Sequence, residues 1–483
     1  MNYTSTQTAQ SVKIESKAMY SVSAEEIGAR IDRLPSSKFV WRMVVLLSLG
    51  AFFEFYELFS TAYLLPGIVK AGILTTTTEN FFDFTGSAGY IASTFIGLLL
   101  GVIAFGTVAD KFGRKMIFTY ALLGYSFSAF MMGLQSDPYW LNFWRLMTGI
   151  GLGVELVTID AYLSELAPAR LRGRAFAVSK IIAFAAVPSV AFLSYLLVPI
   201  EWFEIDGWRW VVFIGASGAC LVWYLRRELP ESARWLASNG QMDEANRVVA
   251  DMEARVEKET GKPLPKPINT VEADKVDTTP DKASFWELWG PEYRSRTIML
   301  MVFHIAQAIG IYGFSNWMPT LLVENGVEIS ESLKYGVIVA LLTPLGPLLA
   351  ITFADRIERK WQITISAIVM AIAGMLFADA TSSVVVLILS ALIVIGGTVI
   401  ALAFHTYQAE LFPTRIRSMG ISLVYSMSRI SGAMSGFLIA ASLKANGVSG
   451  ALMLITACMI VVAIVIGGFG PKTRGRSLEE ISH

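Results

Sequence analysis

The stretch Val108-Ala-Asp-Lys-Phe-Gly-Arg-Lys115 occurs twice in this chain and returns as Phe353-Ala-Asp-Arg-Ile-Glu-Arg-Lys360. A second stretch, Ser164-Glu-Leu-Ala-Pro-Ala-Arg-Leu-Arg172, returns as Ala409-Glu-Leu-Phe-Pro-Thr-Arg-Ile-Arg417. The displacement runs from 108 to 353 and from 164 to 409, which is 245 positions in both cases. Chance similarity would not keep one offset across two motifs. The chain therefore consists of two homologous halves in parallel order, a design typical of secondary transporters.

The composition indicates a membrane protein. Charged residues make up 16% of the 483 residues, against about 25% in soluble proteins, and apolar residues make up 54%. The apolar segments between the charged motifs are long enough to cross a bilayer, which takes about 20 residues. We predict an all-α membrane protein of twelve transmembrane helices in two pseudo-symmetric six-helix bundles. The predicted helices are 40–66, 86–108, 115–136, 139–164, 174–199, 208–226, 296–322, 333–354, 361–379, 383–408, 416–443 and 448–470.

The charges of the short loops predict the orientation. Lysine and arginine gather in one set of loops, and the opposite set is rich in acids, which places the basic loops in the cytoplasm together with both termini. We see no signal peptide in the polar first segment and expect a multi-pass protein of the plasma membrane, in a bacterium the inner membrane. Short amphipathic helices are expected at 22–33 and 241–258, and a flexible linker at 259–282. The predicted domains are an N-terminal segment 1–37, a bundle 38–226, a linker 227–295, a bundle 296–470 and a tail 471–483.

Several classes of function find no support in the residues. The two cysteines, Cys220 and Cys458, lie in apolar helices and imply neither a disulfide framework nor a metal site. No nucleophile–base constellation is visible, so we do not expect an enzyme, and nothing predicts a cofactor. The expected partners are a small-molecule substrate, protons and the lipid bilayer, with no nucleic acid. We expect a monomer.

Four motifs in order resemble the signature set of sugar-porter-type transporters of the major facilitator superfamily, and the likeness spans the chain. They are Asp110-Lys-Phe-Gly-Arg-Lys115, Arg145-xxx-Gly-x-Gly-x-Gly153, Pro230-Glu-Ser-Ala-Arg-Trp-Leu236 and Pro471-Lys-Thr-Arg-Gly-Arg-Ser-Leu-Glu-Glu480. The resemblance implies alternating access around one central site between the bundles. It does not name the substrate, which must come from the site itself.

The resemblance also implies a cytoplasmic gate of charged side chains. An acid at a helix end can pair with an arginine and with the positive N-terminus of a neighbouring helix. We expect Glu165 to pair with Arg172, and Glu410 with Arg417. The alternative for such residues is a solvated basic loop. The predicted gate residues are Asp110, Arg114, Glu165, Arg172, Asp355, Arg359, Glu410 and Arg417.

Ionisable residues inside the predicted helices carry the functional signal, because each costs roughly 2.5–3.5 kcal/mol to insert. Glu54 and Glu57 are spaced i, i+3 and face one side of the first helix. By residue counting, Glu57 and Arg145 reach a similar depth, and Glu54 and Glu155 lie near the midplane. An acid that leaves its arginine can take up a proton, so these four are predicted to couple transport to protons. The alternative is a structural ion pair buried between helices.

By the resemblance, sugar-binding positions have changed character. Lys180 stands where sugar porters have a glutamine, Tyr312 replaces an asparagine, and His405 and Arg429 each replace a tryptophan, while Gln307 keeps a glutamine. A pocket with Lys180 and Arg429 from opposite halves is expensive to leave without a negative charge. The predicted substrate-binding residues are Lys180, Gln307, Tyr312, Trp317, His405 and Arg429.

Three readings stay open at this stage. The first is a proton-coupled symporter of a small organic anion, such as an aromatic or other monocarboxylate. The second is a sugar or polyol symporter, favoured by the tail and loop motifs. The third is a transporter-like receptor, against which the short linker argues. In the first reading Lys180 and Arg429 hold a substrate carboxylate, whereas in a rival to it they permanently neutralise Glu155 and Asp160.

Overall fold

The computed structural model of the protein describes residues 25–77, 80–105, 112–225, 227, 229–266, 284–345, 357–378, 380 and 382–473. Two predicted gate residues, Asp110 and Asp355, lie outside the described residues, as do most of the predicted tail and part of the predicted linker.

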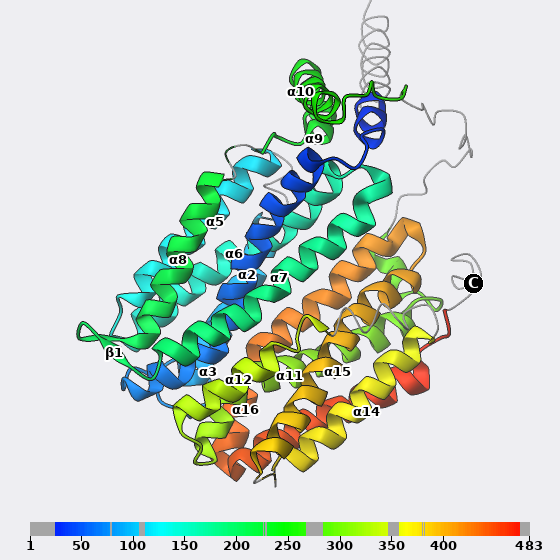
Figure 1. The fold of residues 1–483 in the computed structure, drawn as a ribbon. Helices are drawn as coiled ribbons and strands as arrows, with labels where there is room; N and C mark the ends of the chain where they lie inside the picture. The colour runs from blue at the N-terminus through cyan, green and yellow to red at the C-terminus, as the bar shows by residue number, and fades with distance from the viewer. Residues whose placement is uncertain are drawn as a thin grey trace, which may run out of the picture.

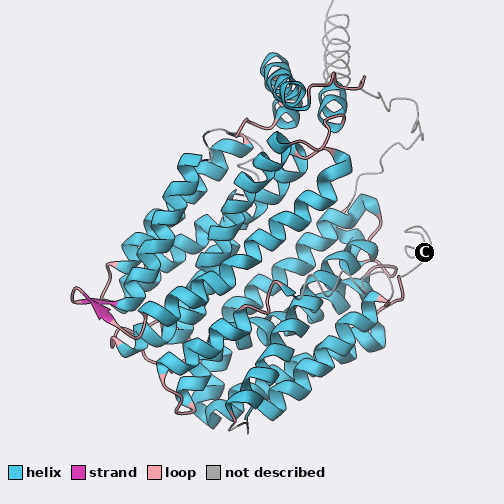
Figure 2. Ribbon diagram, in the orientation of Figure 1, coloured by secondary structure: helices cyan, strands magenta, loops and turns pink. Residues whose placement is uncertain are grey.

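Each predicted transmembrane segment overlaps a helix in the described part of the chain, although α12 covers only the first part of the predicted segment 333–354, and residues 346–354 lie outside the described residues (Figures 1 and 2). The break predicted between the last two segments falls at Asn446 and Gly447, where non-helical backbone angles divide α16 into two spans. Nine of the described helices are long and apolar enough to cross a membrane, with α16 counted once. The first bundle holds α2 (Lys38–Lys70), α3 (Ser87–Phe105), α5 (Arg114–Gly133), α6 (Pro138–Leu166), α7 (Ala169–Leu197) and α8 (Gly207–Leu225). The second holds α11 (Arg294–Glu324), α12 (Ile329–Ala340), α14 (Arg359–Ala378), α15 (Ser383–Glu410) and α16 (Thr414–Ile464), which the π-helical turn η4 (Val465–Phe469) follows.

Glycines set the position of α6 within the first bundle. A Cβ atom at Gly149 would lie 2.6 Å from the carbonyl oxygen of Thr94, and one at Gly153 would lie 2.4 Å from that of Leu98. Only glycine allows α3 and α6 to approach this closely, so the glycines of the motif that begins at Arg145 serve helix packing. This close contact fixes the position of the part of α6 that carries Arg145 and Glu155.

The two ends of the molecule differ (Figure 1). One end, here called the linker face, carries a helix at 25–32 together with α9 (Ala233–Ser238) and α10 (Met242–Thr260). The other, the hairpin face, carries the two-residue strands β1 (Glu201–Trp202) and β2 (Ile205–Asp206). The helices at 25–32 and in α10 were predicted, but α9 was not. The short helix η3 (Phe285–Trp289) leads into α11.

Three carboxylates of the linker face cap helices of the first bundle. Glu231 accepts the backbone N–H groups of Arg114 and Lys115 at 3.0 and 3.1 Å, at the start of α5. Asp32 accepts the N–H group of Ala169 at the start of α7 (2.8 Å). Glu259 accepts that of Phe39 at the start of α2 (2.9 Å). Burial raises the pKa of the Glu231 carboxyl, while these backbone bonds oppose the rise. A negative charge at a helix N-terminus is stabilising, so these three carboxylates stabilise the N-terminal ends of three membrane helices.

On the hairpin face the two bundles meet in an aromatic cluster. The ring of Phe437 on α16 lies 5.8, 5.4 and 5.8 Å from the rings of Phe81, Phe82 and Phe84, which precede α3. The Asn142 side-chain amide donates to the carbonyl oxygen of Phe84 (2.6 Å) and ties this loop to α6. The loop of the first bundle therefore holds a side chain of the second.

We predict that Phe437→Ala lowers the apparent melting temperature in detergent clearly more than Phe82→Ala. Phe437 is 2% exposed and Phe82 is 63% exposed, and truncating a buried phenylalanine costs about 3–5 kcal/mol. Thermal unfolding of the two purified variants measures the difference. Equal shifts would mean that the cluster does not hold the bundles together.

Candidate functional site

Arg145 of α6 is held by a set of buried partners from α2 and α3. Its Nη1 atom lies 3.4 Å from Oε2 of Glu57, with Arg145 fully buried and the Glu57 side chain 3% exposed. The guanidinium also donates to the Glu57 carbonyl oxygen (2.9 Å), to the Thr94 hydroxyl (2.8 Å) and to the Thr61 hydroxyl, and lies over the Tyr90 ring. The structure thus brings together Glu57 and Arg145, the two residues that counting along the sequence placed at a similar depth. Three helices converge on one neutralised charge.

Glu54 forms a second acidic layer one helical turn closer to the linker face. Its side chain is 3% exposed, and its Oε1 atom has no hydrogen-bond partner among the described residues. Glu155 and Lys180 lie within electrostatic reach of this carboxyl, as does Arg429 of the other bundle. Glu54 therefore interacts electrostatically with charged groups of both bundles, whereas Glu57 forms an ion pair with one arginine.

Lys180 does not stand free for a substrate in this conformation. Its Nζ atom lies 3.3 Å from Oδ1 of Asp160, with the two side chains 42% and 46% exposed. The exposed side chain of His405, on α15, lies within electrostatic reach of both. The rival interpretation, in which Lys180 and Arg429 permanently neutralise Glu155 and Asp160, therefore matches the observed geometry for Asp160. The helices α6 and α7 place the side chains of Asp160 and Lys180 at the same level.

Arg429 has a different environment. Its side chain is 5% exposed and its Nη2 atom donates to the Tyr425 hydroxyl at 3.0 Å, with the guanidinium over the Tyr425 ring. It also interacts with the Tyr312 hydroxyl. Among the described residues no carboxylate lies within ion-pair distance of Arg429, so the second half of the rival reading does not match. A buried cation with neutral partners can accept an anion.

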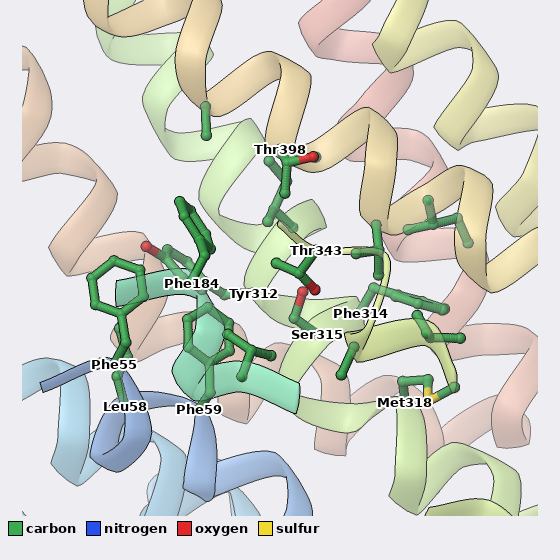
Figure 3. Close-up of a pocket in the computed structure, with 18 of the residues that line it drawn as sticks. Phe55, Leu58, Phe59, Phe184, Tyr312, Phe314, Ser315, Met318, Thr343 and Thr398 are labelled. Atoms are coloured by element: carbon green, nitrogen blue, oxygen red, sulfur yellow. The ribbon is translucent and has the colours of Figure 1, made fainter. Parts of the chain in front are cut away.

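A cavity of about 220 Å³ lies beside Arg429, between α2 and α7 of one bundle and α11, α12 and α15 of the other (Figure 3). Its walls are mostly apolar, with eight aromatic side chains among them, and both Tyr312 and Tyr425 line it. Gln307 and His405 also line it, so three predicted substrate residues are brought to one space. The aromatic wall residues are Phe55, Phe59, Tyr63, Phe184, Tyr312, Phe314, Phe404 and Tyr425.

The sequence prediction and the cavity differ in three respects. Lys180 and Arg429 are not among the lining residues, although Ser428 and Tyr425, which neighbour Arg429 on α16, are. Trp317 does not line the cavity: its side chain is fully buried in the core, while Ser315 and Met318 occupy the cavity side of α11. We therefore drop Trp317 from the candidate residues. Conversely, Phe55 and Phe59 line the cavity but were not among the predicted substrate residues, although their i, i+4 spacing places them on one face of α2.

The charged pairs near the linker face also differ from prediction. Glu165 pairs with Arg114 at 3.1 Å rather than with Arg172, and Glu410 pairs with Arg359 at 3.3 Å rather than with Arg417. The expected partners contact other groups, because each lies in the first turn of a new helix that follows a proline. Arg172 lies 3.9 Å from Asp32, and Arg417 donates to the carbonyl oxygen of Phe412 (3.2 Å). The two observed pairs are related by the sequence repeat, from 114 to 359 and from 165 to 410.

Comparisons with known proteins agree with this architecture. The family model described as "Sugar (and other) transporter" matches residues 43–483. The inner membrane metabolite transport protein YdjE of Escherichia coli is 28% identical, over 95% of this chain and 98% of its own. The niacin transporter NiaP of Acinetobacter baylyi is 28% identical, over 94% and 99%. The xylose transporter XylE from E. coli, in a partially occluded inward-open structure, superimposes with a TM-score of 0.70 at 18% identity, over 91% and 100%.

The family match covers most of the chain, and it agrees with the duplicated bundles and with the fold of the solved structure. The chain belongs to the sugar (and other) transporter family of the major facilitator superfamily and is a multi-pass membrane transporter.

Proposed function

We propose that the protein is a proton-coupled symporter of a small organic anion, an aromatic monocarboxylate, that works by alternating access. The observation that carries this proposal is Arg429, a buried guanidinium held by two phenol hydroxyls beside an aromatic cavity. A carboxylate at this position would accept charge-assisted, bidentate bonds and would neutralise the buried charge. Aromatic walls would stack on a flat ring. Niacin, the aromatic acid named for one relative, has this chemistry.

The two acidic layers support the proposed coupling. Glu57 stays neutralised while Arg145 holds it, and a movement that separates them would leave a buried carboxylate that favours protonation. Glu54 lies between this pair and the charges around Lys180. We propose Glu54, Glu57, Arg145 and Glu155 as the proton path, with either Glu54 or Glu57 as the proton carrier.

The proposed orientation places the linker face and both termini in the cytoplasm. The pairs Arg114–Glu165 and Arg359–Glu410 would then lie at the cytoplasmic mouth, one in each bundle. Because neither pair lines the cavity, we propose that they adjust the balance between conformations and do not touch substrate. Asp110 and Asp355 remain proposed members of this gate.

A sugar or polyol symporter is the alternative. The Gln307 amide favours it, because its buried Oε1 atom has no partner in the described structure and could bind a sugar hydroxyl. The exposed Lys180–Asp160 pair would suit a neutral substrate, since it needs no further anion. The environment of Arg429 argues for the anion.

Replacing Arg429 by lysine tests the substrate class. Lysine keeps the positive charge but loses the planar fork, so we expect benzoate to bind roughly tenfold more weakly or worse. Isothermal titration of purified wild type and variant measures this, with Lys180→Arg as the control that keeps the neighbouring charge. Stabilisation of the wild type by glucose or xylose and by no aromatic acid would favour the alternative.

Replacing Glu57 by glutamine tests the coupling. A neutral amide cannot carry a proton, so we expect the variant to lose accumulation against a gradient while it keeps exchange of internal for external substrate. Proteoliposomes loaded with labelled substrate measure both activities, and retained exchange shows that the variant is folded. The same loss is expected for Glu54→Gln if that residue carries the proton. Wild-type, pH-dependent accumulation by both variants would contradict the proposed path.

Breaking the paired gates tests their role. We expect Arg114→Ala and Arg359→Ala to slow transport severalfold with little change in the dissociation constant of the substrate, because both residues lie away from the cavity. The control is Arg255→Ala, which breaks an exposed pair with Asp251 on α10. A large loss of equilibrium binding in either gate variant would place these residues in the binding site instead.

A further inference from the structure

The β1–β2 hairpin presents two exposed aromatic side chains at the edge of the molecule. The hairpin joins α7 to α8 and projects from the end of α8 on the hairpin face (Figure 1). Trp202 is 53% exposed and Phe203 is 74% exposed, and their rings stack with centroids 5.2 Å apart. Large apolar side chains that gather on a surface mark a contact with something outside the chain.

The two strands separate apolar from acidic side chains. Glu201 pairs with Asp206, and Trp202 pairs with Ile205, in the antiparallel register. Because successive side chains of a strand point to opposite faces, one face of the hairpin carries the two apolar residues and the other carries the two carboxylates. Asp206 also binds Arg209 (3.3 Å). A hairpin divided in this way suits the boundary between water and an apolar phase.

The aromatic side chains of the hairpin continue onto the outer surface of the first bundle. The ring of Trp202 lies 5.6 Å from that of Trp210 on α8, which lies 6.1 Å from the ring of Phe213. The Phe213 ring in turn lies 5.1 Å from that of Phe130 on α5. Phe130 is 44% exposed on a helix that is long and apolar enough to cross a membrane. Tryptophan and other aromatic residues gather at the level where membrane spans meet water.

The turn of the hairpin has an unfavourable backbone. Phe203 and Glu204 have φ angles of 54° and 59°, and within the described residues these are the non-glycine positions with positive φ. A two-residue turn of this kind favours Asn-Gly, because residues with large side chains rarely adopt the left-handed conformation. Such strain points to a function that depends on it. Here it sets the Phe203 ring at the tip of the hairpin, stacked on Trp202.

The base of the hairpin is fixed to the first bundle. A side chain at Gly207 would overlap the carbonyl oxygen of Leu197, so α7 and α8 meet closely there. Arg209 donates to the carbonyl oxygens of Gly133 and Gln135 at 2.6 and 2.7 Å, in the connection between α5 and α6. The hairpin is therefore a rigid extension of the first bundle.

We propose that the hairpin is an interfacial anchor of the first bundle. Trp202 and Phe203 insert into the headgroup region of the bilayer on the hairpin face, with Glu201 and Asp206 turned to the water. The partner is the lipid interface rather than a second copy of the chain, because the ring series is continuous with the exposed surface of α5. The anchor fixes the depth of the first bundle while the second moves, and this role does not depend on which substrate is carried.

Spin labels on the two faces of the hairpin test the contact. Phe203→Cys and Glu201→Cys are made in a chain whose own cysteines, Cys220 and Cys458, are replaced by serine, and each is labelled in phosphatidylcholine vesicles. Oxygen concentrates in the apolar phase and a nickel chelate stays in water, so their collisions with the label report its depth. We expect the ratio of oxygen to nickel collisions to be severalfold higher at position 203 than at position 201. Equal ratios would overturn the inference, as would shielding of position 203 from both probes, which indicates a protein partner.

A second comparison keeps the label at one position. Ile205→Cys, on the apolar face, is labelled in the intact hairpin and in a chain that also carries Trp202→Ser and Phe203→Ser. We expect loss of the two rings to raise nickel collisions at position 205 severalfold, because the hairpin then leaves the interface. The matched control is Trp286→Ser, which removes a ring that is 76% exposed before α11 and should change nothing at position 205. Unchanged collisions in the chain without the two rings would overturn the anchor. If that chain does not fold, the comparison of positions 203 and 201 decides alone.

Discussion

The structure is governed by the cost of burying charge in an apolar bundle. Each ionisable group inside a membrane helix must find compensation, and the first bundle provides it for Arg145 with Glu57 and hydroxyls from two helices. In the described part of the second bundle, the partners of Arg429 are phenol hydroxyls. This asymmetry between two homologous halves is the basis of the proposal that an anion completes the site from outside.

The ion pairs at the helix ends are the same in the two homologous halves, whereas the charged groups at the centre of the molecule differ between the halves. The pairs Arg114–Glu165 and Arg359–Glu410 repeat at the same offset as the sequence motifs. On the linker face, carboxylates from α10, from the helix at 25–32 and from the segment before α9 cap three helices of the first bundle. A rigid cap on one bundle and an aromatic contact between both on the hairpin face are suited to rocking of one bundle against the other. The centre differs between the halves: Arg145 is paired with Glu57, whereas Arg429 contacts tyrosines.

Much of the architecture could be predicted because it depends on local properties. Helix length follows from apolar segments, the twofold design from the constant offset, and the meeting of Glu57 with Arg145 from residue counting along antiparallel helices. Orientation of single side chains depends on helix rotation and on neighbouring chain segments, which residue counting does not give. Trp317 therefore turned out to lie in the core, and Arg172 and Arg417 took partners other than the predicted ones.

The central claim is that a substrate bound in the cavity places its carboxylate at Arg429, beside the cavity. An experimental structure of the protein with benzoate tests it most directly. The account predicts density for one ring between Phe55, Phe184 and Tyr312, with the carboxylate in contact with the Arg429 guanidinium. An acid whose carboxylate instead contacts Lys180, with Arg429 still held only by its two tyrosines, would contradict the claim.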